Sequence, residues 1–117
     1  MMISGGDPTN RAIQAALHGL DARRAAHENN IANVETPGFI AQRVEFESAL
    51  KRAMETGTPD ALTPTVSSTN DAARANGNNV NLGQEMVALT ETALTQELLV
   101  RALNDKYGLV RSALGQG

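Results

Sequence analysis

The C-terminal third of the chain carries a regular repeat, and this repeat limits the fold more than any other feature. From residue 82 to residue 114 the steps between members alternate between four and three residues for nine intervals. That spacing predicts a long helix that packs along another helix. Asn81 is placed to cap its start, with Gln84 three residues later. The predicted packing seam consists of Leu82, Met86, Leu89, Ala93, Gln96, Val100, Leu103, Tyr107, Val110 and Leu114.

A second long helix is predicted near the N-terminus, beginning at Asp7 and Pro8 with a capping residue followed by proline. Its seam residues are Ile13, Leu17 and Leu20, and the spacing continues through Arg24 and His27 to Ile31 and Val34. We therefore expect an all-α fold, in which long N- and C-terminal helices pair as an antiparallel coiled-coil hairpin around a short irregular or extended middle region. The expected segments are 1–34 and 80–117 for the helices, 35–55 for a turn and an extended or short-helix segment, and 56–79 for a flexible loop.

The two middle segments differ in composition. After an extended start, Phe46, Leu50 and Ala53 or Met54 can line a short helix that ends at Gly57. Residues 56–79 are mostly Thr, Asn, Ser, Pro, Gly and Asp, and this composition offers little apolar burial to offset the entropy of ordering. We expect that segment to be mobile unless neighbours order it.

The C-terminal helix also carries a second apolar stripe away from the seam. A helix that is apolar on more than one face requires more than one partner, so the sequence predicts self-association or docking among several copies. The second stripe is made by Val87, Leu94, Leu98, Ala102 and Leu109.

Composition excludes several classes of function. The formal charge is -3, aromatic residues make up 3% of the chain and no long basic run is present, so nucleic-acid binding is not expected. The chain has no cysteine, which excludes disulfides and thiol catalysis. No apolar run is long enough to span a bilayer, and the first residues lack the apolar region of a cleaved secretory signal.

Catalytic and metal-binding patterns are equally weak. His18 and His27 are nine residues apart, so they do not share a helical face at ligand spacing, and "HENN" lacks the second histidine of a zinc-protease helix. Asp21 and Glu28 lie beside Arg24, which indicates a solvated ion cluster. We expect no enzyme activity, no catalytic or metal site and no cofactor.

The stretch "NNIANVETPGF", residues 29–39, stops the first helix abruptly. Asn33 can end the helix in a left-handed conformation. Pro37 and Gly38 suit the central positions of a type II turn, because proline fixes the first and glycine accepts a positive φ at the second. Turn chemistry alone favours an ordinary helix terminator here.

This stretch resembles the N-terminal signature of the bacterial flagellar rod, hook and hook-associated axial proteins. The C-terminal stretch that starts at "NGNNVNLGQEM" is similar to the closing helix of a rod protein, with Val80, Leu82, Glu85, Met86 and Gln96 on the family pattern. The short middle region excludes the distal rod and hook proteins, which insert large β domains there. The predicted assembly motif consists of Asn30, Ile31, Ala32, Asn33, Thr36, Pro37, Gly38 and Phe39.

The resemblance implies a structural subunit of the proximal rod, the drive shaft that crosses the periplasm and transmits torque. It also implies export through the flagellar type III apparatus without a cleaved signal. The implied partners are other copies of the chain, the rod protein FlgC, the base-adaptor protein FliE and the export apparatus. A small coiled-coil adaptor or chaperone of a type III secretion system is the alternative, because helix periodicity alone fits both.

Overall fold

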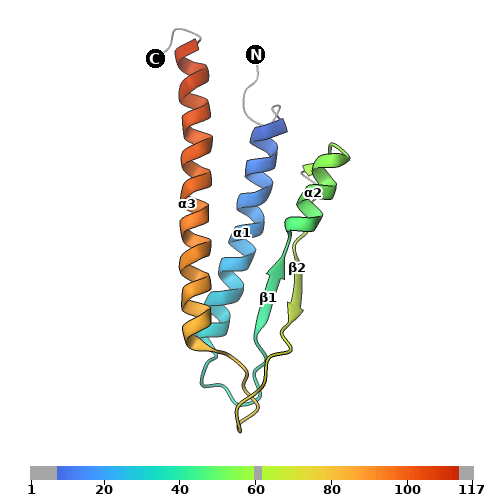
Figure 1. Ribbon diagram of the computed structural model, residues 1–117, viewed down its shortest axis with the longest axis vertical. Helices are drawn as coiled ribbons and strands as arrows, with labels where there is room; N and C mark the ends of the chain where they lie inside the picture. Colours follow the sequence, from blue (N-terminus) through green and yellow to red (C-terminus); the bar gives the residue numbers. More distant parts are fainter. Residues whose placement is uncertain (1–7, 60–61, 114–117) are drawn as a thin grey trace.

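A computed structural model describes residues 8–59 and 62–113, with the side chains of 9–59 and 62–105. The elements in chain order are α1 (Pro8–Ala32), β1 (Gln42–Glu45), α2 (Glu47–Glu55), β2 (Thr65–Ser68) and α3 (Leu82–Ala113). The protein is mostly helical, as expected, and its additional feature is a two-stranded antiparallel sheet (Figure 1). The expected cap at Asp7 lies outside the described residues.

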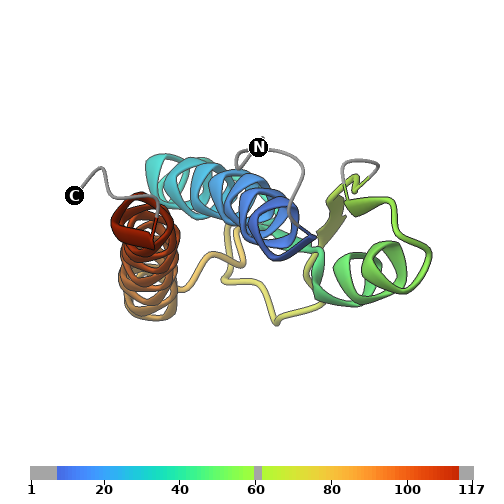
Figure 2. The same cartoon turned by 90° about the horizontal axis from the view of Figure 1, so that it is seen from above.

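The elements form a single flat layer. Helix α1 lies in the middle, with α3 antiparallel to it on one side and α2 with the two strands on the other (Figure 1). The molecule measures 63 × 30 × 14 Å and its radius of gyration is 17.9 Å, whereas a compact domain of this length would have about 13 Å. Seen along α1, the three helices are not in line: α3 and α2 both lie below α1 (Figure 2).

Small residues on one face of α1 allow the middle region to pack closely against it. Ala15 and Ala26 belong to the buried cluster, together with Leu20 of α1, Val44 of β1, and Phe46 and Leu62. A Cβ atom built on Gly19 would lie 2.7 Å from Cδ1 of Phe46 and closer still to Cγ. The glycine weakens the helix by about 1 kcal/mol relative to alanine, but it is the residue that leaves room for the phenyl ring.

Arg23 fastens α1 to the junction of β1 and α2. Its guanidinium lies 4.6 Å from the centre of the Phe46 ring, within the range of a cation–π interaction. Nε and Nη2 donate to the carbonyl of Val44 at 3.1 and 2.8 Å, and Nη1 and Nη2 donate to Glu47 at 2.6 and 2.7 Å. The hydrogen bond from Arg23 lowers the pKa of Glu47 from 4.5 to about 2.

The middle region contains the predicted extended segment and the predicted short helix. Phe46, just before α2, and Ala53 of α2 are buried. Leu50 packs against the buried cluster that contains Phe46, whereas Met54 is exposed. The helix ends at Glu55, and Gly57 follows with φ 75°.

Residues 56–79 contain a strand that the composition did not predict. β2 pairs with β1 in antiparallel register, with Val66 opposite Val44 and Thr65 opposite Glu45. Val66 itself is exposed. Strand β2 is held by backbone pairing with β1 and not by burial of Val66, which explains why the composition did not indicate a strand.

The contact between α1 and α3 differs from the expected seam. Leu82, Met86 and Val100 are 42–55% exposed, so the expectation that they face α1 is wrong. The face of α3 that is turned inward lies about one residue earlier in the repeat, with Thr92 only 5% exposed. The α3 residues on this face are buried or half-buried: Glu85, Ala88, Leu89, Thr92, Ala93, Gln96, Leu99 and Leu103.

Glu85 faces α1 because α1 offers it a polar partner. Nδ1 of His27 lies 2.6 Å from Oε2 of Glu85, and both side chains are largely buried. Turning Leu82 and Met86 toward His27 would leave its ring without this partner, which is costly. Gln96, a member of the expected seam, remains on the inward face and donates to Asp21 at 2.6 Å. Ile13 and Leu17 are half-buried and Leu20 is buried; the side chains of Tyr107 and Val110, and all of Leu114, lie outside the described region.

Replacing Gly19 by alanine tests the close approach to Phe46. We expect Gly19→Ala to lower the free energy of unfolding by about 1–3 kcal/mol, because the overlap with the ring outweighs the gain in helix propensity. Gly83→Ala is the control, since its Cβ would lie 3.6 Å from Oδ1 of Asn81 in ordinary contact. Urea unfolding followed by circular dichroism gives both values, and equal stability of the two variants would contradict the packing described.

The lowered pKa of Glu47 predicts a specific acid sensitivity. Its folded pKa, about 2, lies below the ordinary value of 4.5, so the pair with Arg23 stabilises the fold above pH 4.5 and loses this contribution as the pH falls toward 2. The Glu47 side chain is 64% exposed, so Glu47→Gln should cost less than about 1 kcal/mol at neutral pH. The free energies of unfolding of the two proteins should converge between pH 4.5 and 2; a difference that does not change with pH would exclude the ionic contribution.

Candidate assembly site at the asparagine corner and along helix α3

Two loops cross at one end of the molecule (Figure 1). Residues 30–41 lead from the end of α1 to β1, and residues 71–81 lead from β2 to the start of α3. We call this region the asparagine corner. The corner begins where α1 ends. The amide of Asn33 donates to the carbonyls of both Asn29 and Asn30 at 3.1 Å, and its side chain donates back to Asn29 at 2.8 Å. The expected left-handed conformation of Asn33 is wrong, because among the described residues only glycines have a positive φ.

The Thr36–Phe39 turn has the predicted type II geometry. The amide of Phe39 donates to the carbonyl of Thr36 at 3.2 Å, and Gly38 has φ 74°. Thr36 is also bonded to the end of α1, because its hydroxyl donates to Oδ1 of Asn33 at 3.1 Å. The turn therefore follows from the residues that the motif supplies.

Asn78 connects this turn to the second loop. Its side chain is fully buried, and Nδ2 donates to the carbonyls of Asn33 and Thr36, both at 2.8 Å. Oδ1 accepts the amide of Val80 at 2.8 Å. The amide of Gly38 donates to the carbonyl of Asn76 at 2.8 Å. The two stretches of sequence that resemble the axial proteins are thus bonded to each other.

Asn30 and Asn79 hold the start of β1 in the same way. Asn30 is fully buried; it donates to the carbonyl of Gln42 at 2.7 Å and accepts its amide at 2.9 Å. Asn79 accepts the amide of Ala41 at 2.6 Å and donates to Thr69 at 2.9 Å. Asparagine suits these positions because its side-chain amide both donates and accepts. Each side chain can therefore make backbone hydrogen bonds of the kind that a neighbouring strand would make.

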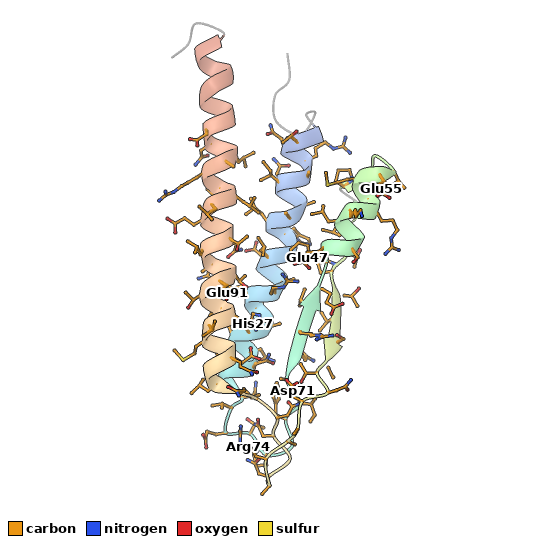
Figure 3. All side chains as sticks on the ribbon, viewed as in Figure 1. His27, Glu47, Glu55, Asp71, Arg74 and Glu91 are labelled. Carbon is orange, nitrogen blue, oxygen red and sulfur yellow. The ribbon has the colours of Figure 1, made fainter. Side chains whose placement is uncertain are left out.

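Arg74, in the second loop, bonds to the backbone of both loops. Its guanidinium donates to the carbonyls of Val80 at 2.5 Å and Val34 at 2.6 Å; Figure 3 shows Arg74 beside the crossing loops. The backbones meet closely there, since a Cβ on Gly77 would lie 3.2 Å from Cα of Gly38. Sequence reasoning missed Arg74, Asn78 and Asn79, although the run of asparagines in "NGNN" was a signal of side chain to backbone bonding.

The structure brings the eight motif residues together at this corner, most with an exposed side. Ala32, Thr36, Pro37 and Gly38 are exposed, Ile31, Asn33 and Phe39 are half-buried, and only Asn30 is buried. The inward amides stabilise the corner and the outward residues are accessible. The seam residues lie elsewhere, along α1 and α3.

Helix α3 leaves apolar side chains uncovered on two sides. Leu82, Met86 and Val100 are exposed on the side next to the contact with α1. Val87, Leu94 and Leu98 are 55–59% exposed on the side away from α1, and Ala102 of the second stripe is also exposed. The side chain of Leu109 lies outside the described region.

The titratable residues form no metal site within the described residues: no group of three His, Cys, Asp or Glu side chains is close enough to hold an ion. His27 lies between α1 and α3 (Figure 3), where it contacts Glu85, and His18 is exposed. Arg24 pairs with Glu28 at 3.9 Å on the surface. No helix within the described part of the chain is long and apolar enough to cross a membrane.

Comparison with known proteins reveals relatives of matching length. The chain is 27% identical to the flagellar basal body rod protein FlgB of Bacillus subtilis, over 93% of this chain and 95% of the relative. It is 26% identical to the FlgB proteins of Yersinia enterocolitica and Escherichia coli, over 99% of this chain and at least 99% of each relative. These similarities extend over nearly the full chain and are consistent with the FlgB family of flagellar basal body rod proteins. No protein-family model matches the chain.

The FlgB relatives decide between the two functions that the sequence left open. A structural subunit of the flagellar rod is supported, and the secretion adaptor or chaperone is not favoured. The relatives are structural proteins and not enzymes. The relatives support a location in the basal body, in association with other rod and basal body proteins.

Asn78 provides the sharpest test of the corner. Asn78→Ala removes the partners of two carbonyls and one amide, and each buried polar group left unpaired costs about 1–3 kcal/mol. We expect a large loss of stability in urea unfolding, with the greatest increase in amide exchange at residues 33–39. Asn70→Ala, an exposed substitution, should change stability by less than about 0.5 kcal/mol. Equal effects of the two substitutions would show that the buried amide does not hold the loops.

Proposed function

We propose that this chain is a subunit of the proximal rod, the part of the drive shaft that crosses the periplasm. Its similarity to FlgB proteins supports a rod subunit, and the observation that carries the proposal is the uncovered apolar surface of α3. Leu94 and Leu98 are more than half exposed, although they lie on a helix whose opposite side is packed. In a chain that functions alone, polar residues at these positions would avoid an exposed apolar patch that promotes aggregation.

Torque transmission requires stiffness and no chemical step. In the proposed rod, α1 and α3 form the inner coiled-coil layer, and the seam and the second stripe pack against neighbouring subunits. The seam residues Leu82, Met86 and Val100 are then covered by other chains. Helices gain most of their stability from such packing, so assembly stiffens each subunit while it builds the shaft.

The asparagine corner determines where the chain leaves this inner layer. Residues 1–34 and 80–117 contribute the helices of the layer, 35–55 lead outward from the corner, and 56–79 return to it. Thr36, Pro37 and Gly38 contribute the exposed surface of the turn, which is available to a neighbour. The buried asparagines keep that surface in one orientation.

The proposed partners are other copies of this chain, the rod protein FlgC and the base-adaptor protein FliE. A contact between unlike surfaces that does not close on itself produces a helical stack, as a shaft requires. The proposal includes export through the flagellar type III apparatus without a cleaved signal.

The experiment that tests the function is the location of the full chain in its own organism. Basal bodies purified from cells that carry a tagged copy should contain the chain, and a deletion should abolish motility until the gene is restored. Recovery only from the cytoplasm, with basal bodies unaffected by the deletion, would reject the rod subunit and restore the adaptor.

Two glycines with the same backbone strain separate the corner from general stability. Gly38 and Gly57 have φ of 74° and 75°, and a Cβ on either would meet no atom within 4 Å. Alanine at each position should cost about 1–2 kcal/mol of stability, because positive φ disfavours a side chain. We expect Gly38→Ala to lower incorporation into basal bodies far more than Gly57→Ala. Equal losses of incorporation would reduce the corner to a purely stabilising role.

A further inference from the structure

Helices α1, α2 and α3 enclose an open trough on one side of the flat molecule. Its volume is about 400 Å³; the floor includes Ala16, Leu20 and His27 of α1, and the walls include Leu50 of α2 and Leu99 of α3. Figure 2 shows how the trough arises, because α2 and α3 both lie below α1. Within the described residues, no element of the chain fills it.

The same chain carries a narrow apolar edge, formed by Val87, Leu94 and Leu98. Successive helix residues are rotated by about 100°, so Leu94 points about 160° away from Thr92. Thr92 is 5% exposed, whereas the three edge residues are 55–59% exposed. The edge therefore lies on the far side of α3 from α1. It cannot enter the trough of its own molecule, because α3 is one wall of that trough.

We propose that the edge of one copy of this chain seats in the trough of a second copy. The two surfaces match in length: residues 87–98 of α3 and residues 16–27 of α1 each span about 17 Å of helix. They also match in part in chemistry, since Leu20, Leu50 and Leu99 of the trough can meet the valine and leucines of the edge. Polar side chains, including Arg23, Glu47 and Glu91, belong to the same lining. A helix laid between three others completes the arrangement of a helical bundle.

This contact is directional and propagates. When one copy's edge is seated, its own trough remains open for the edge of the next copy, so the contact joins unlike surfaces and builds a stack. The occupant is assigned as a second copy because one chain supplies both surfaces. This inference rests on the proposed function, and it names the surfaces by which copies of the subunit meet.

A single seated edge makes a weak pair. The contact is about 17 Å long and no wider than a helix of about 10 Å, which is far below the roughly 800 Å² per partner of a stable complex. The pair is therefore transient in solution and becomes lasting only within an array. The test must detect a weak contact and identify the residues that form it.

Paramagnetic broadening between two chains meets this requirement. The chain has no cysteine, so a nitroxide can be attached at a single introduced cysteine in full-length protein. A Leu94→Cys chain carrying the label is mixed at high concentration with ¹⁵N-labelled, unmodified chain. We expect amide signals of residues 16–27 and 46–50, and of the α3 residues that line the trough, to lose intensity, while signals of residues 36–38 and 76–77 in the asparagine corner are kept.

Val66→Cys is the matched control, because Val66 and Leu94 are both 56% exposed, and Val66 lies on β2, on the opposite side of α1 from α3 (Figure 1). A label at Val66 should leave the trough signals unchanged. Broadening of residues 87–98 by the Leu94 label without broadening of 16–27 and 46–50 would indicate an edge-to-edge contact and overturn the proposal. Equal broadening from both labels, or none at any concentration, would overturn it as well.

The outcome is separable from that of the proposed function. If the unmodified chain is recovered in basal bodies but its trough is not broadened, the rod subunit stands and the edge-in-trough contact is rejected. If the trough is broadened and the chain is absent from basal bodies, self-association stands and the location is rejected. Circular dichroism of both labelled variants checks that each retains the fold.

Discussion

The structure depends on a few buried amide side chains at one end of a thin molecule. Asn30 and Asn78 are fully buried, and Asn79 nearly so, and together they bond the backbone of both crossing loops. The buried apolar residues of these loops are Ala41 and Val80, so hydrophobic burial contributes only part of what holds the loops together. Hydrogen bonds inside a protein contribute modestly when made and cost more when lost. The corner therefore has one arrangement, and the directions of α1, β1 and α3 all follow from it.

The remainder of the molecule is organised by what α1 offers to each neighbour. Toward β1 and α2 it presents Ala15, Gly19 and Ala26, and the strands and Phe46 approach closely. Toward α3 it presents polar groups such as His27, which contacts Glu85 at 2.6 Å. The first contact is dense and the second is partly polar, so most of the apolar surface of α3 is not used within the chain. A rod subunit can use that surface to hold its neighbours.

Local features of the fold were predictable from the sequence, and features that depend on distant residues were not. The helices, the type II turn at Gly38 and the cap at Asn81, which accepts the amide of Gln84 at 3.0 Å, follow from residues a few positions apart. The strand β2 depends on β1, and the role of Asn78 depends on a turn about forty residues earlier. The rotation of α3 away from the expected seam depends on the polar side chains of α1. For the same reason the motif at 30–39 was recognisable, while its partner loop was expected only to be part of a flexible segment.

The crossing of the two loops also sets an order of events during synthesis. The carbonyl of Thr36 acquires its partner only when Asn78 has been made, 42 residues later in the chain. At about 5–20 residues per second on the ribosome, this delay is roughly 2–8 s. During that interval the turn at Thr36 lacks its hydrogen bond from Asn78, so the corner of the nascent N-terminal half is not yet fixed.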